Sequence, residues 1–487
     1  MKIKYLLIFL FTINHFSFGQ KNIWINTRIS TTAGLIVSSD SQTPFLMRSL
    51  QYGTIPINSQ LAYFSGSIKK KYDSLYTADK KLRKFDWGYE IEPHINAGKV
   101  NQVLLPQAYI KVRYKIFEFF AGRRKEIQGL VDTSGTMGSY IWSGNALPLP
   151  KLDISIPRFN SLIPGGLIAI KGNYAHGWFG DGDSVKNYFL HQKSFYGRLG
   201  KPSWKIKVIA GFNHQVQWGG KPTVPFYDKI SEQMISSFGS DISTYFNVVT
   251  GLSMGRLGSW NSQRGVPANE AGNRTGNHLG TVDVGAEINT YWCNFLIYRQ
   301  NIYEDGSLFY LNNISDGLSG ISFTPKKIKF LKKFTLEYLD TRSQGGITFR
   351  NEIAELRGKD NYFNNGIYND SWRYRDRNLG SPLLIAENDQ IEKTKKQNQN
   401  YFVNSKVKAI NLKVSYVFSS LNFSTQILHS NNRGSLEFPI NASQLSFKQD
   451  CHWKYKNYNF RGIISADLGE YWSQHAGLQL QIQKLWR

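Results

Sequence analysis

The sequence predicts an all-β fold: a transmembrane antiparallel β-barrel of roughly 16–18 strands with a small N-terminal helical element. Three observations lead to this fold class. Many segments alternate apolar and polar side chains, aromatic residues make up 14% of the 487 residues, and no apolar run after residue 19 is long enough for a transmembrane helix. Because successive side chains of a strand point to opposite faces, such segments suit a wall with lipid outside and water inside.

The overall composition fits this class better than its alternatives. Hydrophobic residues are 41% of the chain and the mean hydropathy is −0.38, which is too polar for an ordinary helical membrane protein. A barrel strand needs apolar residues at only half of its positions. The formal net charge is +24, from 59 basic and 35 acidic residues, so the chain attracts polyanions such as nucleic acid, lipopolysaccharide phosphates or an acidic polysaccharide.

The first residues indicate the cellular location of the protein. Lys2 and Lys4 precede an apolar core over residues 5–13, and Ser17-Phe18-Gly19 forms a small-x-small cleavage site. We expect a signal peptide over 1–19, cleaved after Gly19; a membrane anchor is disfavoured because the apolar core is too short to span a bilayer. Export to the cell outer membrane removes nucleic acid from the natural partners.

The segment after the signal differs from the rest of the chain. Residues 20–86 are expected to hold short helices and the first strand or strands, with one helix near 44–52 ahead of the barrel and a second helix or turn over 76–84. Residues 87–487 are expected to form the outer-membrane β-barrel, and no linker divides them.

Strand patterns recur through this second region. In 205–218 every second side chain is apolar except at His214. Ser419-Ser420 joins two amphipathic strands by a minimal turn, typical of the periplasmic side of a barrel. The last residues, LQLQIQKLWR, place glutamines opposite leucine and isoleucine, which suits a water-filled lumen. The expected strands are 88–98, 107–122, 167–177, 205–218, 281–292, the hairpin 410–428 and 478–487.

The stretch 106–150 carries the first candidate site. Its strand has an apolar face and a cationic face, and we expect the cationic Lys111, Arg113 and Lys115 to line the lumen. The double arginine Arg123-Arg124 then begins a long, glycine-containing loop that ends at residue 150, so both arginines are expected at a rim of the barrel.

Catalytic and metal-binding patterns are missing from the sequence. The histidines show no metal-ligand spacing, and neither a phosphate-binding glycine loop nor a GxSxG motif is present. Asp181-Gly182-Asp183 lacks the later ligands of a calcium loop and predicts a plain turn. Cys293 and Cys451 are expected to be unpaired more often than bridged. We therefore predict no enzyme, no cofactor and no metal.

The second candidate site is the stretch 361–379, NYFNNGIYNDSWRYRDRNL, in which aromatic rings alternate with arginines. Aromatic rings stack on sugar faces and arginines bind carboxylates by paired hydrogen bonds, so one interpretation is an acidic-glycan site. The other is an extracellular loop with a girdle of aromatics and arginines bound to lipopolysaccharide phosphates. The residues alone do not choose between them. The glycan-binding candidates are Arg123, Arg124, Trp372, Tyr374, Arg375 and Arg377.

Three stretches together resemble a known family. They are LPQAYIKVRYKIFEFFAGRRKEI with the later IWSGNALPLPK, EDGSLFYLNNISDGLSGISF, and NYFNNGIYNDSWRYRDRNLGSPL, and in this order they are similar to the capsule assembly Wzi family in its Bacteroidetes form. The resemblance extends from about residue 23 to the C-terminus. It implies an outer-membrane barrel of about 18 strands with a small helical element and a lectin-like, non-catalytic role in holding capsular polysaccharide at the cell surface. The shorter helical stretch here implies a reduced plug.

The function expected from the sequence is that of an outer-membrane lectin-like protein that binds anionic surface polysaccharide and takes part in capsule assembly or surface attachment. Its expected partners are acidic capsular polysaccharide, lipopolysaccharide, outer-membrane lipid and the capsule export machinery. Two alternatives stay open at this stage, an anion-selective porin and an outer-membrane hydrolase.

Overall fold

The structure is a computed structural model. It describes residues 26–73, 83–229, 232–251, 274–304, 311–348, 358–387, 402–472 and 474–486. The expected signal peptide lies outside the described residues, as does the expected helix over 76–84 except for its last two positions.

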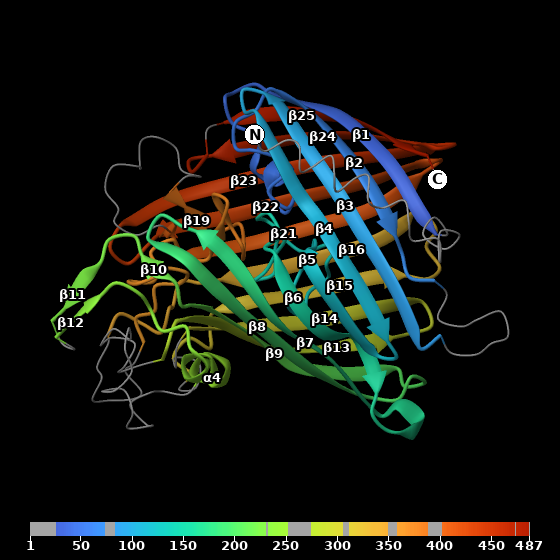
Figure 1. The fold of residues 1–487 in the computed structure, drawn as a ribbon. Coiled ribbons are helices and arrows are strands. Elements are labelled where there is room, and N and C mark those ends of the chain that lie inside the picture. Colours follow the sequence, from blue (N-terminus) through green and yellow to red (C-terminus); the bar gives the residue numbers. More distant parts are fainter. Residues whose placement is uncertain are drawn as a thin grey trace, which may run out of the picture.

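The fold is a closed antiparallel β-barrel (Figure 1). Within the described residues, 18 strands form its wall, each hydrogen-bonded to its neighbours in chain order. The wall closes where the first strand pairs with the last, from Ser30 opposite Leu485 to Ser38 opposite Gly477. The predicted fold class is confirmed.

The wall strands are β1 (Thr27–Ser38), β2 (Leu61–Lys70), β3 (Phe85–Gly98), β4 (Gln102–Tyr114), β5 (Phe117–Arg123), β6 (Lys151–Ser161), β7 (Ile168–Asp181), β8 (Val185–Leu199), β9 (Ile206–Trp218), β13 (Asn277–Asn289), β14 (Cys293–Glu304), β15 (Gly317–Pro325), β16 (Leu331–Asp340), β21 (Val407–Phe418), β22 (Leu421–Gly434), β23 (Pro439–Tyr455), β24 (Tyr458–Gly469) and β25 (His475–Leu485). The remaining elements are α3 (Phe45–Arg48), η2 (Pro164–Gly166), β10 (Lys221–Pro222), β11 (Phe226–Asp228), β12 (Gln233–Ile235), α4 (Ile242–Thr250), β17 (Arg373–Tyr374), β18 (Arg377–Asn378), β19 (Ile385–Ala386) and β20 (Phe402–Asn404).

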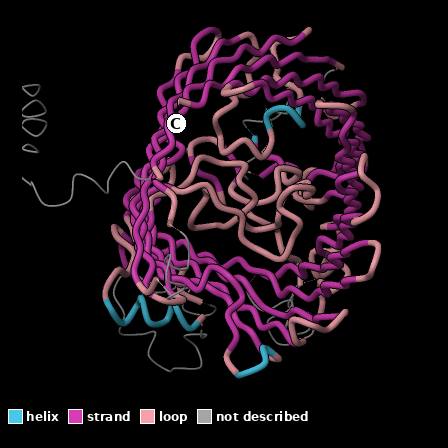
Figure 2. The backbone as a smooth tube through the Cα atoms, turned by 90° about the vertical axis from the view of Figure 1, so that its right-hand side faces the viewer, coloured by secondary structure: helices cyan, strands magenta, loops and turns pink. Residues whose placement is uncertain are grey.

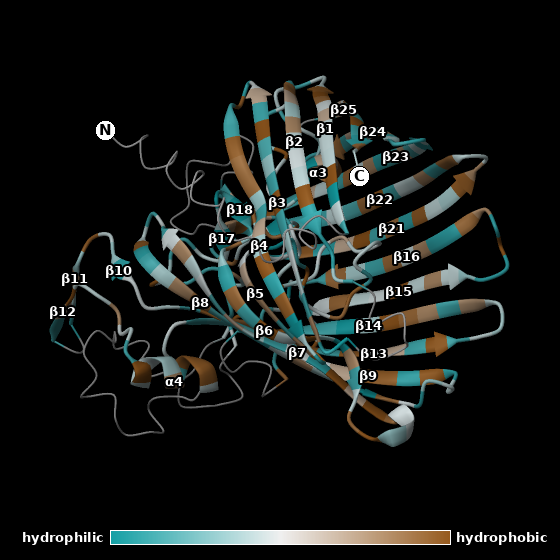
Figure 3. Ribbon diagram, turned by 45° about the vertical axis from the view of Figure 1, so that its right-hand side comes forward, coloured by the Kyte–Doolittle hydropathy of each residue, from teal (hydrophilic) through white to brown (hydrophobic). Residues whose placement is uncertain are grey.

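The two faces of the wall follow the period of two in the sequence, and the strands show alternating hydropathy in Figure 3. In β21, Ile410 points outward and is exposed, whereas its neighbour Asn411 points inward and is fully buried. The hairpin of β21 and β22 turns at 419–420, where Phe418 pairs with Leu421, as predicted. The outer face is therefore the apolar one.

The last strand also has the predicted faces, and its inner glutamines make hydrogen bonds within the barrel. Leu478, Leu480 and Ile482 are exposed on the outside of β25. On the inside, Gln479 Nε2 donates to the Tyr63 hydroxyl at 2.8 Å, and that hydroxyl donates to Gln481 Oε1 at 2.9 Å. Gln479 and Gln481 thus satisfy the hydroxyl of the buried Tyr63.

The two ends of the barrel differ in their connections (Figure 1). One end, here the turn end, carries short turns such as 115–116, 419–420 and 456–457, together with the last residues of β25. The opposite end, the loop end, carries the long connections 39–60, 124–150, 219–276 and 341–406. The loop that begins at Arg124 is therefore at the end opposite to the chain termini of the wall.

Two sequence-based boundaries need correction. Residues 107–122 are not one strand, because Lys115 has a left-handed φ of 55° and turns the chain between β4 and β5. The short helix α3 does not precede the barrel; it follows β1 and lies inside the ring of strands, as Figure 2 shows. Strands β1 and β2 both come from the segment 20–86.

One helix lies outside the wall. α4 packs over Trp218, whose ring centroid is 5.0 Å from that of Tyr245, and Gly251 at the end of α4 lies beside His214 and His278. His214 Nε2 and His278 Nδ1 are 2.9 Å apart. This cover explains why a histidine interrupts the otherwise apolar outer face of β9. Among the described residues, no helix combines the length and apolar character needed to cross a bilayer. Cys293 and Cys451 are both unpaired thiols.

Candidate functional site

The lumen is filled by a plug, defined here as the described connections 39–60, 124–150 and 358–387 (Figure 2). The second and third segments join through backbone pairing, in which the Ser143 N–H donates to the Leu379 carbonyl and the Ser381 N–H to the Tyr140 carbonyl, both at 2.9 Å. The first segment is attached to the second, since the Tyr52 N–H donates to the Gly144 carbonyl at 2.8 Å. Three distant stretches thus form one body.

Aromatic side chains make the core of this plug. Tyr140, Tyr362, Phe363 and Trp372 are each at most 1% exposed. The rings of Tyr140 and Phe363 are 5.1 Å apart and those of Tyr140 and Tyr362 are 6.0 Å apart. They belong to one continuous apolar cluster that also contains inward side chains of the wall. The plug therefore packs against the wall as a core rather than resting loosely in the lumen.

Inward-facing polar groups of the wall fix the plug in position. Glu337 of β16 accepts a hydrogen bond from the Met137 N–H at 2.6 Å, and Asp283 of β13 accepts one from the Leu130 N–H at 2.8 Å. Gln300 of β14 accepts from the Tyr140 N–H at 3.1 Å. Buried amides are costly when unpaired, so these contacts fix the path of the loop backbone.

An ion-pair cluster joins the start of the plug to the wall. Glu126 Oε2 lies 2.6 Å from Lys151 Nζ, and Glu126 Oε1 lies 2.5 Å from Arg124 Nη2. Arg124 Nη1 also lies 2.5 Å from Glu118 Oε1. Burial would raise the pKa of Glu126, but the neighbouring Lys151 and Arg124 outweigh it and lower the pKa. Glu126 is therefore ionised although its side chain is only 11% exposed.

A second charged contact fixes the plug near β16. Asp132 Oδ2 accepts from the Ser322 hydroxyl at 2.5 Å and lies 2.9 Å from Lys333 Nζ. Burial would raise the pKa of Asp132, but hydrogen bonds from Ser322, Ser134 and Lys333 outweigh it and lower the pKa to about 2. Asp132 stays ionised over the whole physiological range.

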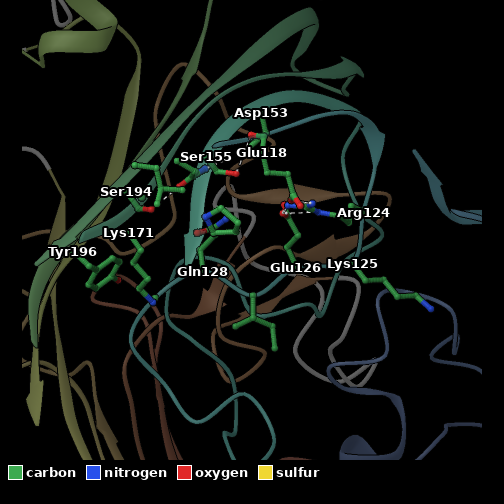
Figure 4. Close-up of a pocket in the computed structure, with 16 residues that line it drawn as sticks. Glu118, Arg124, Lys125, Glu126, Gln128, Asp153, Ser155, Lys171, Ser194 and Tyr196 are labelled. Atoms are coloured by element: carbon green, nitrogen blue, oxygen red, sulfur yellow. Dashed lines mark hydrogen bonds and ion pairs between the residues drawn. The ribbon is translucent and has the colours of Figure 1, made fainter. Parts of the chain in front are cut away.

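A polar cavity of about 390 Å³ lies between the plug and the wall (Figure 4). Its volume is within the range of small-molecule sites. Its wall residues sit in the turn-end parts of β5, β7 and β8, so the cavity lies on the turn-end side of the plug. The cavity is lined by Glu118, Arg124, Lys125, Glu126, Ile127, Gln128, Gly129, Asp153, Ser155, Ile156, Pro157, Lys171, Gly172, Asn173, Ser194 and Tyr196.

The charges of this cavity are mixed. Lys171 places its ammonium 4.6 Å from the Tyr196 ring centroid, and Lys125 is paired with Glu92 at 2.6 Å. Asn173 Nδ2 donates to Asp153 Oδ2 at 2.9 Å. With donors and acceptors of both signs, the cavity is suited to a small polar molecule more than to a simple anion.

The predicted lumen residues are in three different settings. Lys111 lies 3.8 Å from Glu118, and Arg113 lies 3.3 Å from Asp86, so both face inward but are neutralised by buried carboxylates. Lys115 is exposed in the turn between β4 and β5 and does not belong to the lumen wall. Two of the three predicted residues thus face the lumen, where acidic partners balance their charge.

Most of the predicted glycan-binding residues are inside the plug. Trp372 is fully buried, and Arg377 is buried with its Nη2 donating to the Ile55 carbonyl at 3.0 Å. Arg123 and Tyr374, 251 positions apart, are brought together, since Arg123 Nη2 donates to the Tyr374 hydroxyl at 2.7 Å. Arg375 alone among the six candidates is exposed.

The acidic partners of the lumen cations and one exposed loop were not predicted from the sequence. Glu118 and Asp153 stand at inward positions of β5 and β6, and the strand period would have located them had the turn at Lys115 been placed. The hairpin of β11 and β12 projects from the loop end (Figure 1) and exposes Tyr227 opposite Met234. A short two-strand hairpin inside a long connection leaves little periodic signal.

A closed barrel filled by its own loops is the class of protein that this architecture defines, and solved structures of outer-membrane barrels share the fold. Wzi of Escherichia coli, described as an outer-membrane protein involved in group 1 capsule assembly and as a carbohydrate-binding β-barrel, superposes with a TM-score of 0.57 at 15% identity. The match covers 95% of this chain and 86% of Wzi. The porins OccD3 of Pseudomonas aeruginosa and OccAB4 of Acinetobacter baumannii give TM-scores of 0.44 and 0.45 at 9% and 10% identity, each over 94% of this chain and 91% and 98% of theirs. No protein-family model and no curated protein sequence matches the chain.

Proposed function

We propose that the protein is an outer-membrane lectin-like barrel that binds anionic surface polysaccharide and takes part in capsule assembly or attachment. The loop end faces outward in this proposal, because long loops are extracellular and short turns periplasmic in outer-membrane barrels. The observation that carries the proposal is the plug. Loops that would leave a passage in a porin here form a single core with the wall.

The plug supports binding over conduction. A conducting barrel needs a continuous water-filled lumen, whereas the plug places fully buried aromatic rings across it. The same packing holds the outer parts of the loops in fixed positions, which lowers the entropy lost when a polymer binds. That Wzi is described as a carbohydrate-binding barrel supports a glycan as the ligand.

The exposed groups of the loop end supply the contacts. Arg375 is exposed, and its guanidinium lies 5.9 Å from the Tyr374 ring centroid. The guanidinium of Arg123 lies 5.4 Å from the same ring and fixes its position. An exposed arginine binds a sugar carboxylate by paired hydrogen bonds, and Tyr227 offers an exposed ring on which a sugar stacks. Trp372 and Arg377 position the loop rather than touch the polymer. Repetition along the polymer multiplies such weak contacts.

The test is binding of capsular polysaccharide from the native cell to the purified barrel, with dextran as the neutral comparison. We expect binding of the capsular polymer alone, and a loss of about tenfold in affinity for Arg375→Glu, because a charge-assisted bidentate contact becomes a repulsive one. Lys359→Glu is the matched control, since Lys359 is another exposed cation of the same long connection.

Two results would reject the proposal. Equal binding of dextran and capsular polymer would exclude an acidic polysaccharide as the specific ligand. A steady, large, anion-selective current through wild-type barrels in planar bilayers would favour the porin.

A further inference from the structure

The turn end carries an unbalanced positive charge. The turns 115–116, 200–205, 326–330 and 456–457 contain lysines and no aspartate or glutamate, and the turns 162–167, 290–292 and 419–420 contain no charged residue. In the described part of the connection 71–84, Asp73 is the one acidic residue, and it is paired with Arg83. Lys115, Lys201, Lys205, Lys326, Lys327, Lys329 and Lys456 are all exposed there. By contrast, exposed acidic residues such as Asp183, Glu232 and Asp376 stand among the cations of the loop end.

Four lysines of the turn end lie against aromatic rings, and these four are named the collar. Lys327 Nζ is 3.4 Å from the centroid of Tyr291, and Lys484 Nζ is 3.7 Å from that of Trp486. Lys115 and Lys456 are each 5.4 Å from the ring of the tyrosine that precedes them. All four distances are within the range of cation–π contacts.

The rings of the collar belong to the outer surface of the barrel. Tyr114, Tyr291, Tyr455 and Trp486 are each at least half exposed, and they stand where the apolar outer face ends. Such rings form the girdle that marks the level of lipid headgroups. A lysine held on a girdle ring therefore has its ammonium at the height of the headgroup phosphates.

The collar is distributed around the barrel instead of forming one patch. Its lysines come from three parts of the wall: the β4–β5 turn, the β15–β16 turn, and the neighbouring β23–β24 turn and end of β25. A single docked protein would cover one side only, whereas a bilayer leaflet meets the whole circumference. The distribution thus favours lipid over a soluble acidic partner.

We propose that the collar binds the headgroups of anionic phospholipids in the leaflet at the turn end. The ammonium groups pair with the phosphates while the rings pack on the glycerol and upper acyl region. This proposal depends on the barrel spanning a bilayer and is independent of glycan binding at the loop end.

Native mass spectrometry of the full-length protein, released from micelles containing equal amounts of phosphatidylglycerol and phosphatidylcholine, tests the proposal. We expect wild type to retain phosphatidylglycerol preferentially. The variant Lys115→Gln/Lys327→Gln/Lys456→Gln/Lys484→Gln is expected to lose about fivefold of that preference for each lysine removed.

The matched control removes the same charge from the other end, with Lys99→Gln/Lys221→Gln/Lys229→Gln/Lys359→Gln, and is expected to keep the preference. All eight side chains lie at the surface, and far-UV circular dichroism verifies the barrel in both variants. An equal loss in both variants would show that net charge alone acts and would overturn the proposal. So would a wild type without preference for phosphatidylglycerol, or one whose collar instead captures soluble polyglutamate.

Discussion

The buried Glu126–Lys151 pair gives the sharpest test of how the plug is held. The Lys151 side chain is 1% exposed, and its ammonium contacts Glu126 at 2.6 Å and Gln192 Oε1 at 2.8 Å. In Glu126→Gln the ammonium keeps only neutral hydrogen-bond partners, whereas Arg124 still has Glu118. The perturbation therefore removes the ion-pair partner of Lys151 and leaves Asp153, on the same face of β6, as its nearby acidic group.

The expected magnitude follows from breaking one side of a buried ion pair. Such a change costs about 3 kcal/mol, whereas replacing both partners by neutral groups of similar shape is close to neutral. Glu126→Gln/Lys151→Met should therefore recover most of the loss, with a coupling energy of about 2 kcal/mol in the double-mutant cycle. The lowered pKa of Glu126 also means that its ionised form stabilises the folded state. This contribution to stability is present above about pH 4.5 and is lost as the pH falls further.

Hydrogen exchange measures this loss locally. The Ser143 and Tyr52 N–H groups, which join the plug segments, should exchange about a hundredfold faster in Glu126→Gln, since 3 kcal/mol corresponds to about two decades. Amides of the β21–β22 hairpin, remote from the cluster, serve as the internal control. Unchanged exchange in the single variant, or additive losses in the double variant, would refute the reasoning.

Two further predictions concern the plug. The pKa of Asp132 is lowered from 3.8 to about 2, so its ionised form contributes about 1–2 kcal/mol of stability. This contribution is complete above pH 4 and disappears as the pH falls toward 2. In a series of denaturation curves at different pH, Asp132→Asn should therefore reduce the loss of stability at acid pH and leave the pH dependence near pH 7 parallel to wild type. Trp372→Ala opens a cavity in the plug core and should lower the free energy of plug unfolding by about 3–5 kcal/mol, while Trp372→Phe should lose clearly less; equal effects of the two variants would contradict the packing argument.

The strands of the wall could be predicted because their sequence pattern depends only on residues that are close in the chain. A strand with lipid on one side repeats every two residues, and that period is visible in the hairpin 410–428 and in the last strand without any knowledge of partners. Lys115 was misplaced because one strand was assumed to run through 107–122. The outward apolar side chains stand at even positions in β4, such as Ile110 and Tyr114, but at odd positions in β5, such as Phe117 and Phe119. The period therefore changes phase at the two-residue turn, which Lys115 begins with a left-handed φ.

The plug could not be predicted in the same way, because aromatic rings and arginines suit two opposite environments. Trp372 could stack on a sugar or fill a core, and Arg377 could bind a carboxylate or a backbone carbonyl. Only the long-range partners decide, and these lie far off in sequence: Arg377 bonds to the Ile55 carbonyl, and Arg123 to Tyr374. The aromatic and arginine residues of 361–379 were recognised as a functional group from the sequence. Most of their side chains, however, are buried within the protein instead of being open to a ligand.

The formal net charge of +24 does not produce a uniform electrostatic potential over the protein. Inward cations such as Lys111 and Arg113 are matched by Glu118 and Asp86, whereas the lysines of the turns have no acidic neighbour in those turns. A strand of 13 residues such as β13 is about 40 Å long and, at a tilt of about 40°, separates the two ends by about 30 Å. The Debye length at physiological salt is only about 8 Å, so a polymer at the loop end does not experience the collar. Any preference for an acidic glycan must therefore come from local groups such as Arg375 and not from the net charge.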